Sequence, residues 1–83
     1  MPRIAIDVLL KPEILDPQGR AIEAALPGLG HEGVDGVRVG KHLELDVDAE
    51  GEQLEATVAQ LCDDFLVNPI IETWSWRVVE AVG

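Results

Sequence analysis

Apolar residues alternate with other residues near the start of the 83-residue chain. Over residues 4–10, two isoleucines, a valine and a leucine share one face by the two-residue period of a strand. Ala5 and Leu9 lie on the opposite face, which is therefore also partly apolar. This pattern predicts a central strand of a sheet.

The middle of the chain repeats the alternating pattern twice. Residues 34–39 predict a second strand, and residues 42–48 predict a third, with Leu, Leu and Val on one face and acidic residues and His42 on the other. The dipeptide Gly40-Lys41 between them is a turn signal. These residues are expected to form a hairpin with one apolar face.

Two other stretches carry apolar residues at helical spacing. Residues 17–26 and 52–67 each predict a helix with one buried stripe, and residues 70–79 predict a last strand. The order strand, helix, strand, strand, helix, strand predicts an α+β fold, a ferredoxin-like β-α-β-β-α-β sandwich. Its antiparallel sheet would carry both helices on one face, and the chain would be a single domain, residues 1–83.

The first helix begins with a conflict between two local preferences. Asp16 can cap the free N–H groups of the first turn, and Pro17 suits the first helical position. Gly19 lies inside the same turn, where it costs about 0.5–1 kcal/mol relative to alanine. The cost implies that another backbone approaches Gly19 closely, either from a partner chain or from a tight turn of its own domain.

The composition argues against several classes of partner. Sixteen acidic and six basic residues give a net charge of −10, which repels phosphate backbones and anionic lipids. Nucleic acid and membranes are therefore not expected as partners. The N-terminus contains no long apolar run, so neither a signal peptide nor a membrane span is expected.

Few residues suggest chemistry within the chain itself. Cys62 is the single cysteine, which excludes an intrachain disulfide and is expected to be a small buried hydrophobe. His31 and His42 lie in different segments without metal-ligand spacing, so no metal site is expected. Ser75 has no adjacent base, and no phosphate-binding glycine motif occurs. No catalytic residues and no cofactor are therefore expected in this chain.

Trp74 and Trp76 lie two residues apart on the last predicted strand and so share one face of the sheet. They either cap the core or anchor an interface, in which tryptophan is enriched. An apolar open face of the sheet, with Ala5 and Leu9, would favour self-association through these residues.

Several segments occur in a distinctive order and spacing: Leu15-Asp16-Pro17-Gln18-Gly19, Leu29-Gly30, Val34, Val37-Arg38-Val39-Gly40-Lys41, Glu44-Leu45, Cys62, Phe65-Leu66, Asn68-Pro69-Ile70-Ile71-Glu72 and Trp74. Together, over about residues 3–80, they resemble the PurS subunit family of phosphoribosylformylglycinamidine synthase. This enzyme of purine (IMP) biosynthesis makes formylglycinamidine ribonucleotide from formylglycinamide ribonucleotide, glutamine and ATP.

The resemblance implies a non-catalytic, cytoplasmic subunit of an ATP-dependent glutamine amidotransferase ligase. A PurL-type synthetase subunit would bind ATP and magnesium, and a PurQ-type glutaminase subunit would release ammonia. This chain, as a homodimer or homotetramer, would bridge the two and aid ammonia transfer. The expected partner-binding residues are Asp16, Pro17, Gln18, Gly19, Arg20, Arg38, Gly40 and Lys41, and the expected self-association residues are Trp74 and Trp76.

Two further interpretations remain open from the sequence. A small-molecule-binding regulatory module of the ACT type has the same order of strands and helices. A structural dimer without other partners is the third possibility.

Overall fold

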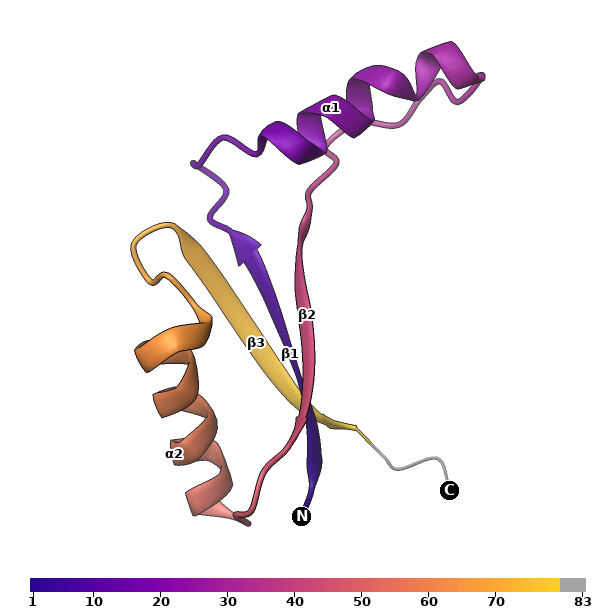
Figure 1. Cartoon of the computed structure of the whole chain (residues 1–83). Coiled ribbons are helices and arrows are strands. Elements are labelled where there is room, and N and C mark those ends of the chain that lie inside the picture. The colour runs from indigo at the N-terminus through magenta and orange to yellow at the C-terminus, as the bar shows by residue number, and fades with distance from the viewer. Residues whose placement is uncertain (80–83) are drawn as a thin grey trace.

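The computed structural model describes residues 1–79. Three strands form one antiparallel sheet in the order β2-β1-β3, with β1 in the centre (Figure 1). The elements, in chain order, are β1 (Arg3–Leu10), α1 (Pro17–Ala25), the 3-10 turn η1 (Pro27–Leu29), β2 (Gly40–Asp46), α2 (Glu52–Leu61), the π-helical turn η2 (Cys62–Leu66) and β3 (Glu72–Val79).

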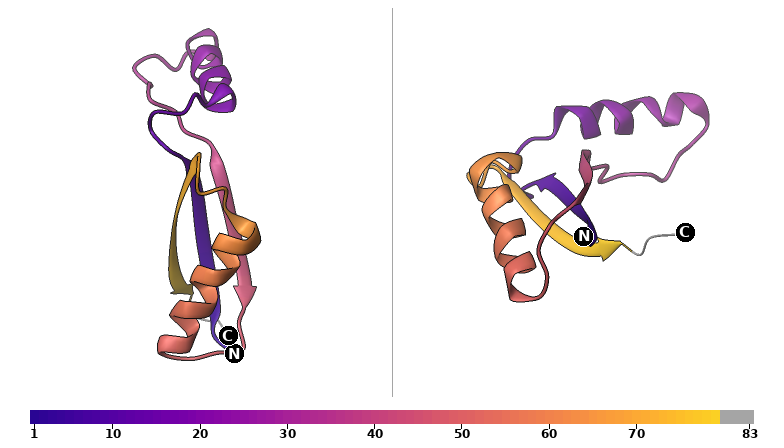
Figure 2. Two further views of the ribbon diagram at one scale, coloured as in Figure 1. Left: turned by 90° about the vertical axis from the view of Figure 1, so that its left-hand side faces the viewer. Right: turned by 60° about the horizontal axis from the view of Figure 1, so that its bottom comes forward.

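The hydrophobic core lies between the sheet and α2, which crosses one face of it (Figure 2). Ile6 is at the centre, opposite Leu43 of β2 and Trp76 of β3. The alternation in β1 therefore directs its isoleucines and Val8 into the core, as predicted. The buried residues of the core are Ile4, Ile6, Val8, Val47, Leu54, Val58, Cys62 and Val67.

The predicted second strand is wrong, because residues 34–39 form a loop. Side chains satisfy the backbone of this loop instead of a neighbouring strand. The Val39 N–H donates to the carboxylate of Asp16 at 2.7 Å, and the Gly36 N–H donates to Glu23 at 3.0 Å. Gly36 also has a φ of 68°, which interrupts an extended conformation. Gly40-Lys41 is consequently the start of β2, and no hairpin turn forms there.

The prediction that both helices cover one face of the sheet is also wrong. Within residues 1–79, α2 is the helix that lies on the sheet. The segments α1 and η1 extend away from the end of β1 and form what we call the arm, residues 17–29 (Figure 1). Without a strand at 34–39, the sheet is too narrow to lie beneath α1. Ile22 and Leu29 of the arm are exposed as a result.

The α+β class, the antiparallel sheet and the order of the remaining elements are confirmed. The fold is ferredoxin-like, with the helix of the first strand–helix unit displaced into the arm. The predicted helix at 52–67 is divided into α2 and η2, where the Val67 N–H donates to the carbonyl of Cys62, five residues earlier.

Candidate functional site

The root of the arm is fastened by the side chain of Asp16, which is only 5% exposed. One carboxylate oxygen accepts from the Gly19 N–H at 2.9 Å, which caps α1. The other oxygen accepts from the Val39 N–H at 2.7 Å, just before β2. These two hydrogen bonds hold the pKa of Asp16 below its ordinary value of 3.8, and the bond from Gly19 has the larger effect. One carboxylate therefore both begins the helix and fixes it to the sheet.

Gly19 is required by a contact within its own chain. A Cβ at this position would lie 2.3 Å from the carbonyl oxygen of Val37 and 2.7 Å from Oδ2 of Asp16. The backbone that approaches the first turn of α1 is therefore the loop at 34–39. This contact explains the tolerated helix penalty through packing on the domain itself. Partner binding by residues 16–20 stays a prediction.

Three of the eight predicted partner-binding residues, Asp16, Arg20 and Arg38, line one groove at the root of the arm. Asp16 and Arg20 lie on one side, and Val37 and Arg38 lie on the other. The guanidinium of Arg38 donates to the carbonyl oxygens of Leu10 at 2.7 Å and Lys11 at 3.0 Å, which holds the loop against the end of β1. The side chains of Pro17, Gln18 and Arg20 are exposed.

Gly40 and Lys41, which were also predicted to bind a partner, lie on β2 and do not line this groove. Gly40 begins the strand opposite Leu9. Lys41 donates to the carbonyl of Leu66 at 3.3 Å, and its ammonium is 3.9 Å from a carboxylate oxygen of Glu72. Both residues therefore have contacts within the chain.

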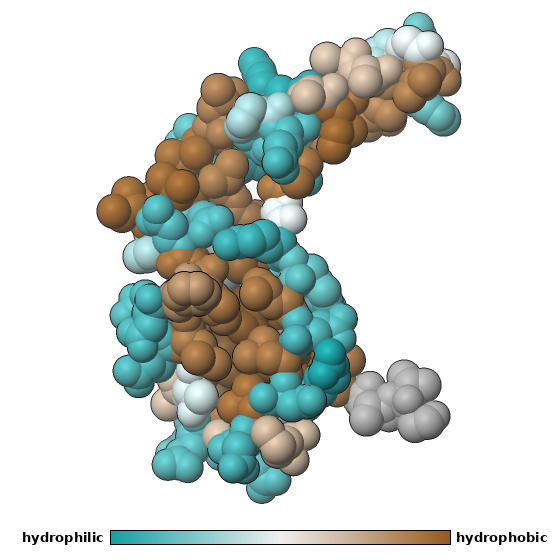
Figure 3. Space-filling model, in the orientation of Figure 1, coloured by the Kyte–Doolittle hydropathy of each residue, from teal (hydrophilic) through white to brown (hydrophobic). Residues whose placement is uncertain are grey.

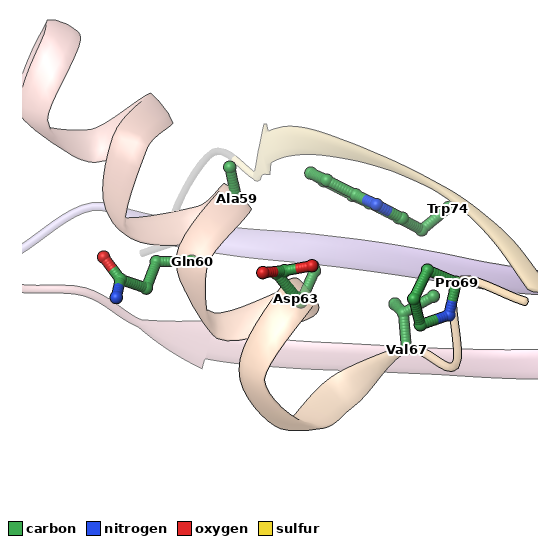
Figure 4. A pocket seen from close by; sticks show the side chains of 7 residues that line it. Ala59, Gln60, Asp63, Val67, Pro69 and Trp74 are labelled. Atoms are coloured by element: carbon green, nitrogen blue, oxygen red, sulfur yellow. The ribbon is translucent and has the colours of Figure 1, made fainter.

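Trp74 and Trp76 lie on the sheet face that carries α2. Trp76 is half-buried and packs against the core. Trp74 is 36% exposed and forms one wall of a groove between β3 and α2. Figure 4 shows its indole ring across from Ala59 and Asp63 of the helical segment. Trp76 is therefore a core residue, whereas Trp74 lines an accessible groove. Self-association through these residues stays a prediction.

On the face seen in Figure 3, apolar side chains gather at two places. One is the groove beside α2, which has a volume of about 480 Å³ and is lined by Ala59, Gln60, Cys62, Asp63, Val67, Pro69 and Trp74. The other is the arm, where Ile22 is 46% and Leu29 is 72% exposed. The sequence did not reveal the groove, because its walls come from segments whose packing depends on the tertiary structure.

The opposite face of the sheet is charged, which contradicts the predicted apolar open face. Ala5 is fully buried there, between Glu44 of β2 and Arg77 of β3. Leu9 is exposed, but it lies alone near the end of β1. The long polar neighbours of Ala5 cover it, so Ala5 cannot contribute to an apolar contact surface.

The described residues add little chemistry to these surfaces. Among residues 1–79, no three His, Cys, Asp or Glu side chains come together as metal ligands. Cys62 is buried as predicted, and burial raises the pKa of its thiol. Within the same part of the chain, the helices are all too short or too polar to cross a membrane.

The fold and the surfaces define a small ferredoxin-like α+β domain with two exposed apolar surfaces and a fastened arm. The chain belongs to the PurS family, described as phosphoribosylformylglycinamidine (FGAM) synthase, whose family model matches residues 3–80. The ACT-like alternative is therefore not favoured.

Individual relatives agree with this assignment. The chain is 44% identical over 75 residues to the phosphoribosylformylglycinamidine synthase subunit PurS of Mycobacterium leprae. The aligned region covers 90% of this chain and 92% of that protein. Its structure matches that of Bacillus subtilis PurS with a TM-score of 0.86 and 35% identity, over 96% of this chain and 100% of the other. It also matches a chain in the structure of PurLQS from Thermotoga maritima, with a TM-score of 0.83 and 34% identity, over 95% and 100% of the two chains.

Proposed function

We propose that this chain is the small, non-catalytic subunit of a phosphoribosylformylglycinamidine synthase, and that it joins a PurL-type synthetase to a PurQ-type glutaminase in purine biosynthesis. The observation that carries the proposal is the match to a chain of the PurLQS structure. That match extends over all of the other chain, so the matched component is itself about the size of this one. In this role, the chain helps ammonia pass from the glutaminase to the synthetase.

The chemistry of the reaction belongs to the partners in this proposal. ATP and magnesium are bound by the synthetase subunit, and this chain holds no cofactor. A cytoplasmic location stays a prediction.

Self-association through the arm is part of the proposal. The radius of gyration is 16.2 Å, whereas a compact domain of this length has about 12 Å. The excess reflects an arm that exposes Ile22 and Leu29 instead of covering the sheet. The groove beside Trp74, on the sheet face that α1 leaves uncovered, offers an apolar surface of the matching kind. We therefore assign the arm of one copy to the groove of a second copy, in a homodimer or homotetramer.

Reconstitution with the two partner subunits tests the function. Purified synthetase and glutaminase are expected to make product from glutamine slowly until this chain is added, whereas ammonia-dependent turnover depends on it less. A full glutamine-dependent rate without the chain would contradict the bridging role.

A pair of exposed side chains tests the partner surface at the root of the arm. Gln18→Ala combined with Arg20→Ala removes an amide and a cation without touching Asp16 or Gly19. We expect weaker co-purification with the partner subunits and an unchanged melting temperature. Gln53→Ala, an exposed change on α2, is the matched control and is expected to co-purify normally. Normal assembly of the double variant would exclude these two side chains from the interface.

A further inference from the structure

The open face of the sheet carries six charged or titratable side chains from all three strands. Arg3 and Asp7 come from β1, His42, Glu44 and Asp46 from β2, and Arg77 from β3. Arg3 lies 3.3 Å from both Glu44 and Asp46, and the guanidinium of Arg77 contacts Asp7. The register places Asp7 directly opposite His42. Among these six side chains, histidine is the type whose ordinary pKa lies near neutral pH, so its charge can change there.

The hydrogen bonds of His42 determine its protonation state. Its Nδ1 lies 2.6 Å from a carboxylate oxygen of Asp7, and its Nε2 lies 2.9 Å from a carboxylate oxygen of Glu44. An ionised carboxylate only accepts hydrogen bonds, and a neutral imidazole has a single N–H to donate. Both contacts are satisfied together only when both ring nitrogens carry a proton.

We propose that the protonated imidazole of His42 is a pH-sensitive clamp that fastens β2 to β1, and that its deprotonation loosens this side of the sheet. The clamp joins two strands that are separated in the sequence by the arm, since Asp7 precedes α1 and His42 follows the loop at 34–39. It therefore acts where β2, at the edge of the described sheet, pairs with the centre.

The charge balance of the face supports the clamp. With His42 protonated, three cations meet three carboxylates; without that proton, the face has one uncompensated negative charge in a chain of net charge −10. The carboxylates of Asp7 and, next, Glu44 raise the pKa of His42 above its ordinary value of 6.5. Arg77 of β3 and Arg3 of β1 weaken this rise in the pKa of His42, because each neutralises part of the charge of one of the two carboxylates.

The sign of the pH dependence follows from these shifts. Because the pKa of His42 is raised by folding, its stabilisation is fully present below about pH 6.5 and is lost as the pH rises through the folded pKa. At acid pH the limit is set by the carboxylates. The pKa of Asp7 is lowered chiefly by His42 and then Arg77, so its contribution is lost only as the pH falls below its ordinary value of 3.8.

Titration of the full chain by NMR tests the proposal. In His31→Gln, which leaves His42 as the only histidine, the imidazole resonance should titrate above 6.5. The melting temperature of the same variant should fall by about 1–5 °C as the pH rises through that value. His42→Gln should lack this fall. Titration of His42 at or below 6.5, or the same fall in His42→Gln, would overturn the proposal.

A second variant keeps the histidine and removes one acceptor. Glu44→Gln should lower the pKa of His42 and shift the fall in melting temperature to lower pH, while Arg3 keeps its pair with Asp46. Glu55→Gln, an exposed change on α2, should leave both unchanged. An unaltered His42 titration in Glu44→Gln would show that the two carboxylates do not share the imidazolium.

Discussion

The sheet covered by α2 and the arm formed by α1 and η1 are held in place by different forces. The sheet and α2 bury their apolar side chains against each other: Ile4 and Ile6 of β1 and Val58 of α2 have no exposed surface. The arm exposes its apolar side chains and is fastened at its root by the carboxylate of Asp16 and by the close approach at Gly19. Hydrophobic burial therefore stabilises the first region, whereas polar contacts at the root hold the second and leave Ile22 and Leu29 exposed.

The difference explains how the arm has a fixed position on the sheet and still exposes apolar side chains. Two hydrogen bonds to one carboxylate define a direction, but they bury little area. An element held in this way keeps its orientation while its apolar side chains remain available for association.

Ile6→Ala tests the burial of the sheet. The side chain is fully buried between Leu43 and Trp76, so the free energy of unfolding should fall by about 2–5 kcal/mol. Urea unfolding measures the loss. Leu9→Ala, on the other face of the same strand, is the matched control and should cost less than about 1 kcal/mol. Equal losses in the two variants would contradict the assignment of the core to the α2 side.

Gly19→Ala tests the close approach at the root of the arm. Because the added Cβ would meet the Val37 carbonyl, the free energy of unfolding should fall by about 1–3 kcal/mol. Amide hydrogen exchange of Val39 should also accelerate, because the clash displaces the loop from Asp16. Gly28→Ala in η1 adds a Cβ with no atom within 4 Å and should not destabilise the chain. Similar behaviour of the two variants would argue against the contact.

Asp16→Asn tests the fastening carboxylate. The Gly19 and Val39 N–H groups donate to different oxygens of Asp16, and the amide NH2 group would face one of these donors, so the melting temperature at neutral pH should fall by about 3–8 °C. The pKa of Asp16 is lowered by folding, so its contribution is present above pH 3.8 and is lost as the pH falls through the folded pKa. Calorimetry should therefore show the difference from the wild type shrinking at low pH. A difference that is constant across acid pH would contradict the role of the ionised carboxylate.

Leu29→Ser tests the exposed apolar surface of the arm. The side chain is 72% exposed, so the free energy of unfolding of the monomer should change by no more than about 0.5 kcal/mol. Self-association, measured by sedimentation velocity, should weaken clearly. Ala24→Ser, an exposed change on α1, should sediment like the wild type. Unchanged sedimentation of Leu29→Ser would remove the arm from the self-association interface.

Local patterns in the sequence were sufficient to predict the strands and helices that bury one face. The alternation in residues 4–10 predicted β1 and its core face, and the helical spacing after Gly51 predicted α2, because these periods arise from the backbone geometry itself. Asp16 and Pro17 similarly predicted the start of α1, since a cap acts within one turn. Family membership also followed from the order of short segments along the chain.

Three other features depend on contacts between segments that are distant in the sequence. Residues 34–39 have the alternation of a strand, but Asp16 at the root of the arm and Glu23 within it accept hydrogen bonds from their backbone and hold them as a loop. The same loop explains Gly19, because a Cβ at that position would clash with the carbonyl of Val37, eighteen positions away. The pairing of His42 with Asp7 likewise depends on strand register. A local pattern specifies a conformation and a face, but which distant group meets that face depends on long-range packing, which no short stretch of sequence contains.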